Sequence, residues 1–105
     1  MDKITIDVGV YTALETDLTG FDFTGITKVI LTIKNAPSPY SPVLFEQEFA
    51  EPKVYNVVIP PEVSLKLTDQ AVYDFVKVLT DGKTYKNGDN GIIELRKGVG
   101  DDANH

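Results

Sequence analysis

The sequence predicts an all-β domain, an antiparallel β-sandwich of seven or eight strands with at most one short helical turn. Apolar residues in every long segment alternate with period two or form short β-rich runs, and no ten-residue segment shows a helical stripe. Turn residues separate these runs at a spacing typical of sandwiches. We expect one domain over residues 1–99, followed by a flexible polar tail over 100–105.

The first half of the chain contains four runs that predict strands, at residues 4–8, 10–14, 28–34 and 43–49. In the third run Val29, Leu31 and Ile33 share one face, because side chains two apart point the same way in a strand. Residues 36–42 contain three prolines and are therefore expected to form an ordered or extended loop rather than a central strand.

The second half predicts further strands at residues 54–59, 71–79, 83–86 and 92–99. Tyr55, Val57 and Ile59 are expected to point inward. Pro61 suits the first turn of a short helical segment that reaches no further than Leu67. The Asp-Gly pair at 81–82 predicts a hairpin, and the Asn-Gly-rich run at 87–91 predicts a second turn or a bulge.

A corner motif leads into the strand at 71–79. After Leu67, an acidic residue, a small residue and a tyrosine stand at alternate positions, as Asp69, Ala71 and Tyr73. Such a tyrosine is typically buried, with its hydroxyl donating to the backbone of the corner. A cysteine would stand two residues later in an immunoglobulin domain, and this chain has Phe75 there. The motif therefore predicts an immunoglobulin-like sandwich without the disulfide.

Composition narrows the classes of partner. The chain has 105 residues, a net charge of -6 and a pI of about 4.6, and its basic residues are scattered, so nucleic acid and anionic membranes are not expected partners. The absence of cysteine excludes disulfides and thiolate metal sites and favours a reducing compartment. The first residues lack the apolar run of a signal peptide, so we expect synthesis and folding in the cytoplasm.

Residues with catalytic chemistry are sparse. The one histidine is His105, the last residue, so the sequence predicts no catalytic triad and no enzyme. Glu46 and Glu48 alternate on a strand and are expected to be solvated. The Asn87–Gly91 run has one carboxylate and fails the spacing of a calcium loop. No metal or cofactor is expected.

The strand at 71–79 has too many apolar residues for a free sandwich. If Tyr73 and Phe75 point inward, Val72, Val76 and Val78 fall on the outer face, which is normally polar. One interpretation is a contact surface for another copy or another protein. The other is a β-bulge near Val76 that returns it to the core.

Tyr40 in the Pro-rich loop is a second candidate contact residue. A rigid loop presents an aromatic side chain at little entropic cost on binding. The alternative is that the loop packs on its own domain.

Most of residues 17–99 carry short motifs in a fixed order. They are Asp17-Leu18-Thr19-Gly20, the strand Val29 to Lys34, the run Val57 to Glu62, Tyr73-Asp74-Phe75-Val76, Asp81-Gly82, and Gly91 to Val99. This ordered set resembles the N-terminal immunoglobulin-like domain of phage upper baseplate proteins. The resemblance implies a non-enzymatic assembly module of a phage or prophage particle, associated with its tail, baseplate or fibres. Such a module is made in the host cytoplasm and contacts other virion proteins or copies of itself.

A small ligand-binding module, such as a carbohydrate-binding immunoglobulin-like domain, is the alternative. It needs clustered exposed aromatics with polar groups. The candidates, Tyr11, Tyr40 and Tyr85, lie on separate segments.

Overall fold

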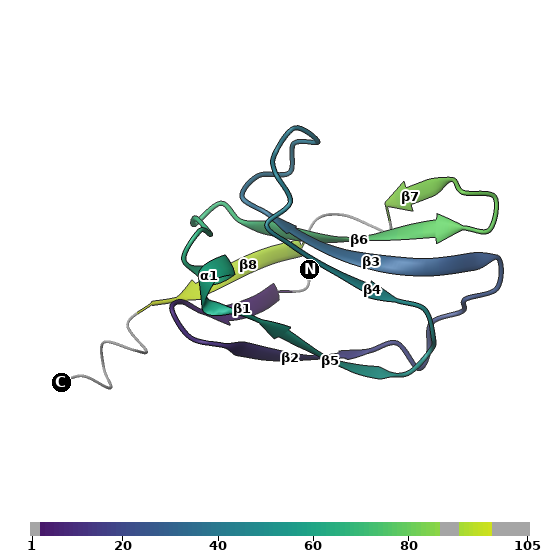
Figure 1. Ribbon diagram of the computed structural model, residues 1–105, viewed down its shortest axis with the longest axis horizontal. Coiled ribbons are helices and arrows are strands. Elements are labelled where there is room, and N and C mark those ends of the chain that lie inside the picture. The colour runs from purple at the N-terminus through teal and green to yellow at the C-terminus, as the bar shows by residue number, and fades with distance from the viewer. Residues whose placement is uncertain (1–2, 87–90, 98–105) are drawn as a thin grey trace.

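The computed structural model describes residues 3–86 and 91–97, and these form eight strands and one short helix (Figure 1). The all-β prediction is confirmed. In chain order the elements are β1 (Lys3–Asp7), β2 (Thr12–Asp17), β3 (Ile26–Lys34), β4 (Phe45–Phe49), β5 (Val54–Ile59), α1 (Pro61–Ser64), β6 (Val72–Leu79), β7 (Thr84–Lys86) and β8 (Gly91–Arg96).

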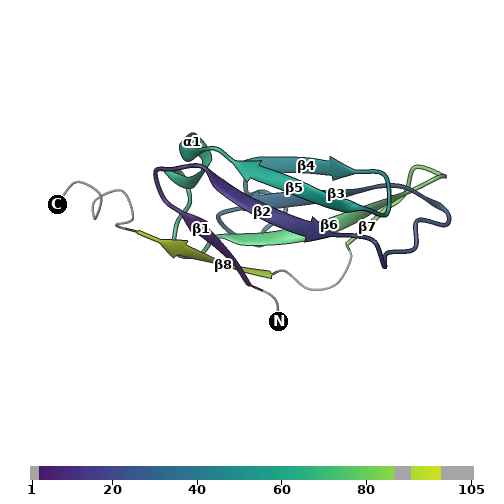
Figure 2. The same cartoon turned by 90° about the horizontal axis from the view of Figure 1, so that it is seen from below.

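Six strands make one sheet and two make another. The larger sheet has the order β1-β8-β6-β3-β4, and β7 also pairs with β6. The first residues of β6 pair with β8, whereas Val76, Lys77 and Val78 pair with β7. The smaller sheet is the antiparallel pair β2-β5, which lies against one face of the larger sheet (Figures 1 and 2).

The larger sheet is mixed, which corrects the prediction of purely antiparallel pairing. Strand β1 runs parallel to β8, with Ile4 opposite Ile93 and Ile6 opposite Leu95. Parallel neighbours need a long connection between them, and here almost the whole chain separates the two strands.

The core lies between the two sheets. As predicted, the β3 residues Val29, Leu31 and Ile33 are all buried. The other buried apolar residues are Ile6, Phe49, Tyr73 and Ile93 of the larger sheet, Val57 and Ile59 of the smaller sheet, and Leu67 and Ala71 of the segment before β6. Tyr55 is half-buried, and its ring stands edge-on to Phe49 with centroids 4.7 Å apart.

The second strand is shifted from its predicted place at 10–14. Residues 8–11 instead carry the chain from the larger sheet to the smaller one, and β2 begins at Thr12. The Thr12 hydroxyl is buried there and accepts a hydrogen bond from the Asp7 backbone N–H at 2.9 Å. At the far end Asp17 closes the strand, because its Oδ1 accepts from both the N–H and the hydroxyl of Thr19.

Helix α1 begins at Pro61 as predicted and is one turn long. It connects β5 in the smaller sheet with the corner before β6. Its last residue, Ser64, is 1% exposed, and its hydroxyl accepts from the Gly9 N–H and donates to the Pro61 carbonyl, both at 2.9 Å. Ser64 therefore fixes α1 against the turn between β1 and β2. No helix in the described parts of the chain is long and apolar enough to cross a membrane.

Candidate protein-contact surface

The three valines of β6 lie on the face of the larger sheet that points away from β2 and β5. Pairing with β3 continues without a shift from Val72 opposite Lys34 to Val78 opposite Lys28. Val76 therefore keeps the side it shares with the other two, and the bulge that would return it to the core is not found. The one irregularity lies in β3, between Ile26 and Lys28.

We call this side of the larger sheet the outer face. Because side chains alternate and paired residues share a side, the register fixes its members. They are Lys3, Thr5 and Asp7 of β1, Ile92, Glu94 and Arg96 of β8, Val72, Asp74, Val76 and Val78 of β6, Lys28, Ile30, Thr32 and Lys34 of β3, Glu46 and Glu48 of β4, and Thr84 and Lys86 of β7.

An apolar strip runs along β6 in the middle of the outer face and is interrupted by Asp74. Val76 stands opposite Ile30 of β3, and Val72 stands opposite Ile92 of β8. The three valines and Ile30 are half-buried, and Ile92 is 52% exposed. In Figure 1 the β2-β5 pair covers only the opposite side of this sheet.

Polar groups within and beside the strip are paired with one another. Lys28 Nζ lies 2.9 Å from a carboxylate oxygen of Glu48 on the neighbouring strand. The Thr32 hydroxyl donates to the Asp74 carboxylate, which lies directly across from it. These contacts keep the charged groups satisfied within the face and beside its apolar strip.

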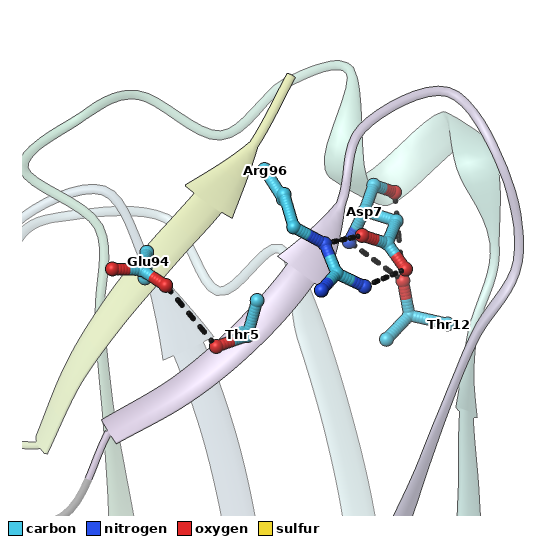
Figure 3. A network of polar contacts seen from close by, with 5 residues as sticks. All are labelled: Thr5, Asp7, Thr12, Glu94 and Arg96. Carbon is cyan, nitrogen blue, oxygen red and sulfur yellow. Dashed lines mark hydrogen bonds and ion pairs between the residues drawn. The ribbon is translucent and has the colours of Figure 1, made fainter. Parts of the chain in front are cut away.

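A polar network joins β1 to β8 at the end of the outer face (Figure 3). Arg96 forms a two-pronged bond with Asp7, from Nε to Oδ1 at 2.5 Å and from a terminal nitrogen to Oδ2 at 3.0 Å. The Thr5 hydroxyl lies 3.4 Å from Glu94, which also pairs with Lys3 at 3.2 Å. The hydrogen bond from Arg96 holds the pKa of Asp7 below its ordinary value, and the same bond raises the pKa of Arg96.

The Pro-rich loop leaves Tyr40 free of its own domain. This side chain is 93% exposed, so it does not pack as the alternative interpretation required. The Ser38 hydroxyl accepts from the Tyr40 N–H at 3.1 Å, which fixes the backbone of the loop tip. The loop between β3 and β4 rises on the outer-face side of the larger sheet (Figure 1).

The corner residues are packed as a unit before β6. Leu67, Ala71 and Tyr73 are buried, whereas Asp69 is exposed and lies 3.4 Å from Lys97 Nζ. The Ala71 N–H donates to the Thr68 carbonyl at 3.0 Å, which closes the turn. The bond from the Tyr73 hydroxyl to the backbone of 67–71 stays a prediction.

Gly91 is a packing residue that the sequence patterns did not single out. It pairs with Tyr73 at the start of β8, and the tyrosine ring occupies the place of a Cβ atom there. The available signal was a glycine directly before the strand predicted at 92–99, in a chain with a corner tyrosine.

The remaining candidates do not assemble into a chemical site. Glu46 and Glu48 are exposed on β4, as expected for a solvated face. The described residues contain no group of three His, Cys, Asp or Glu side chains that could hold a metal. His105 and positions 87–90 of the predicted turn lie outside the described residues.

The tyrosines of the carbohydrate-binding alternative are exposed but dispersed. Tyr11 is 69% exposed and Tyr85 is 51% exposed. The turn between β1 and β2 that carries Tyr11 lies at one end of the molecule, and β7 with Tyr85 lies at the other (Figure 1). The structure does not bring them together in one cluster.

Comparisons with protein-family models, curated proteins and solved structures gave no match for this chain. Its function is therefore inferred from the outer face, the corner and the exposed loop.

Proposed function

We propose that this chain is a non-enzymatic assembly module of a phage or prophage particle, built on an immunoglobulin-like sandwich and acting through protein–protein contacts. The observation that carries the proposal is the apolar strip on the outer face. Val76 and Ile30 lie at its middle on paired strands, in a position where a free sandwich normally has polar residues.

The order of the strands supports the immunoglobulin-like assignment. Variable-type immunoglobulin domains have strands G, F, C and C′ in one sheet and B and E in the other. The strands β8, β6, β3 and β4 follow the first order, and the β2-β5 pair matches the second. Tyr73, near the start of the strand equivalent to F, occupies the place of the corner tyrosine.

The exposed loop supports a role in docking. The loop that carries the exposed Tyr40 rises on the same side of the sheet as the valines (Figure 1), and the backbone of its tip is already hydrogen-bonded. A partner seated on the outer face would meet both the valine strip and this loop. Aromatic side chains held in this way lose little freedom on binding.

The particle context rests on the ordered motifs that resemble phage baseplate domains. Purified particles from an induced culture of the source strain provide the test, by peptide mass spectrometry of particle and soluble fractions. Peptides of this chain should co-purify with the tail or baseplate proteins in constant ratio through two successive gradients. Peptides confined to the soluble fraction, while other structural proteins are recovered in particles, would overturn the proposal. Flanking genes for tail or capsid proteins would agree with the first outcome.

A further inference from the structure

We infer that the partner of the outer face is a second copy of this chain, an inference that rests on the proposed docking role of that face. Its basis is the distribution of charge. The outer face carries five basic residues and five acidic ones. The basic residues are Lys3, Lys28, Lys34, Lys86 and Arg96, and the acidic residues are Asp7, Glu46, Glu48, Asp74 and Glu94.

This balance is local to the outer face. The whole chain has ten basic and sixteen acidic residues, which give a net charge of -6. Because the charges of the outer face sum to zero, none of this net charge comes from that face. Elsewhere in the described residues, acidic side chains outnumber basic ones by seven to five. Two identical acidic molecules repel each other, and that repulsion is smallest when their neutral faces meet.

Most of the balanced charges are also satisfied within the face. Lys28 pairs with Glu48, Arg96 pairs with Asp7, and the Thr32 hydroxyl satisfies Asp74. A second copy therefore meets few charged groups that need a new partner when water is removed. In a two-fold pair the same strip serves both molecules, so Val76 and Ile30 of one copy face the equivalent strip of the other.

Four outer-face charges make no ion pair with another described residue, and Lys34 and Glu46 are two of them. Lys34 stands opposite Val72, and Glu46 stands opposite Thr32. Changing them alters the balance of the face without breaking an internal salt bridge, so they test the charge argument separately from the apolar strip.

Sedimentation equilibrium of the full chain, from about 10 μM to about 1 mM, measures the association. We expect a monomer–dimer equilibrium in the wild type. Val76→Glu should raise the dissociation constant at least about tenfold, because it buries a charge in the strip. Val58→Glu is the matched control: Val58 is 50% exposed on β5, in the other sheet, and this variant should associate as the wild type does.

The second pair of variants tests charge. Lys34→Glu gives each face a net charge of about -2 and should weaken association, and adding Glu46→Lys should restore it. Lys66→Glu makes the same change in total charge at an exposed position off the face and should leave association unaltered. These variants keep the test decisive where Val76→Glu fails to fold.

Three results would overturn the inference. The first is a wild type that stays monomeric at about 1 mM, even where its peptides are found in particles, since the face then serves a different protein. The second is equal loss of association in Val76→Glu and Val58→Glu. The third is collapse of the fold in Val76→Glu together with unchanged association in Lys34→Glu. Absence from particles would instead contradict the proposed function and leave self-association as measured.

Discussion

The ring of Tyr73 fills the space in which a side chain at Gly91 would begin. A Cβ atom added to Gly91 would lie 2.1 Å from both Cε2 and Cζ of the tyrosine, and 2.6 Å from its hydroxyl oxygen. The two residues are directly paired across β6 and β8, and Tyr73 is 7% exposed. The corner strand and the last strand therefore approach each other through a contact that only glycine permits.

Gly91→Ala should destabilise the fold by about 1–3 kcal/mol, because the buried ring or the backbone of β8 has to move. Urea denaturation followed by circular dichroism measures the change. Gly20→Ala is the control, since a Cβ atom there meets nothing within 4 Å and the backbone is not in the left-handed region. Equal stability of the two variants would show that β8 adjusts freely at its first residue.

Tyr73→Phe tests the corner hydrogen bond. Removal of the hydroxyl from this buried side chain should cost about 1–3 kcal/mol, because the backbone acceptor in 67–71 is left without its donor. Tyr85→Phe, at a 51% exposed position on β7, should change stability by less than about 0.5 kcal/mol. A loss below about 0.3 kcal/mol for Tyr73→Phe in chemical denaturation would mean that the corner makes no such bond.

Ser64→Ala tests the contact between α1 and the turn after β1. The variant leaves the Gly9 N–H without its acceptor in a site where the serine is 1% exposed, so we expect a loss of about 1–3 kcal/mol. Ser41→Ala is the comparison, because the bond shown for Ser41 uses its backbone N–H. Two variants of equal stability in thermal unfolding would show that water replaces the Ser64 hydroxyl.

Local patterns predicted the elements of this fold better than their contacts. Period two located the buried residues Val29, Leu31 and Ile33, because alternation in one strand needs no knowledge of its neighbours. The Asp7–Arg96 bond joins residues 89 positions apart, and no local pattern connects them. The parallel pairing of β1 with β8 is equally long-range.

The candidate surface was predictable only in part, because alternation along one strand is visible in the sequence and pairing between distant strands is not. Alternation placed Val72, Val76 and Val78 on one face, but the choice between bulge and flat strand depended on the register against β3. The contribution of Ile30 and Ile92 to the strip, and the charge balance of the face, required the order of strands in the sheet. The burial of Ser64 also depended on a distant turn, at Gly9.

Folding is expected to need no metal. The run at 87–91 has one carboxylate, too few to hold calcium tightly, although positions 87–90 lie outside the described residues. The melting temperature should therefore be the same in millimolar calcium and in excess chelator. A rise of several degrees with calcium that chelator reverses would contradict this expectation, because a ligand that binds only the folded state raises its stability.

Asp7 should make stability depend on acid pH. Its pKa in the folded chain is below the ordinary 3.8, chiefly because Arg96 donates to the carboxylate. Its contribution is therefore fully present above pH 3.8 and is lost as the pH falls through the lower, folded-state value. The Asp17 carboxyl has a lowered pKa too, through its bond from the Thr19 hydroxyl, so the wild-type profile alone does not isolate Asp7.

The variant Asp7→Asn isolates the contribution of the Asp7 carboxylate to stability. The variant should be less stable than the wild type near neutral pH, and the gap should narrow steadily below pH 3.8 as the wild-type carboxyl takes up its proton. Urea titrations of both proteins between about pH 2 and pH 7 measure this gap. High salt should shrink the gap at neutral pH, since the Arg96 side chain is 62% exposed and the pair is open to screening. A gap that is the same at every pH would mean that the asparagine acts through packing and that the Asp7–Arg96 ion pair between β1 and β8 contributes nothing to stability.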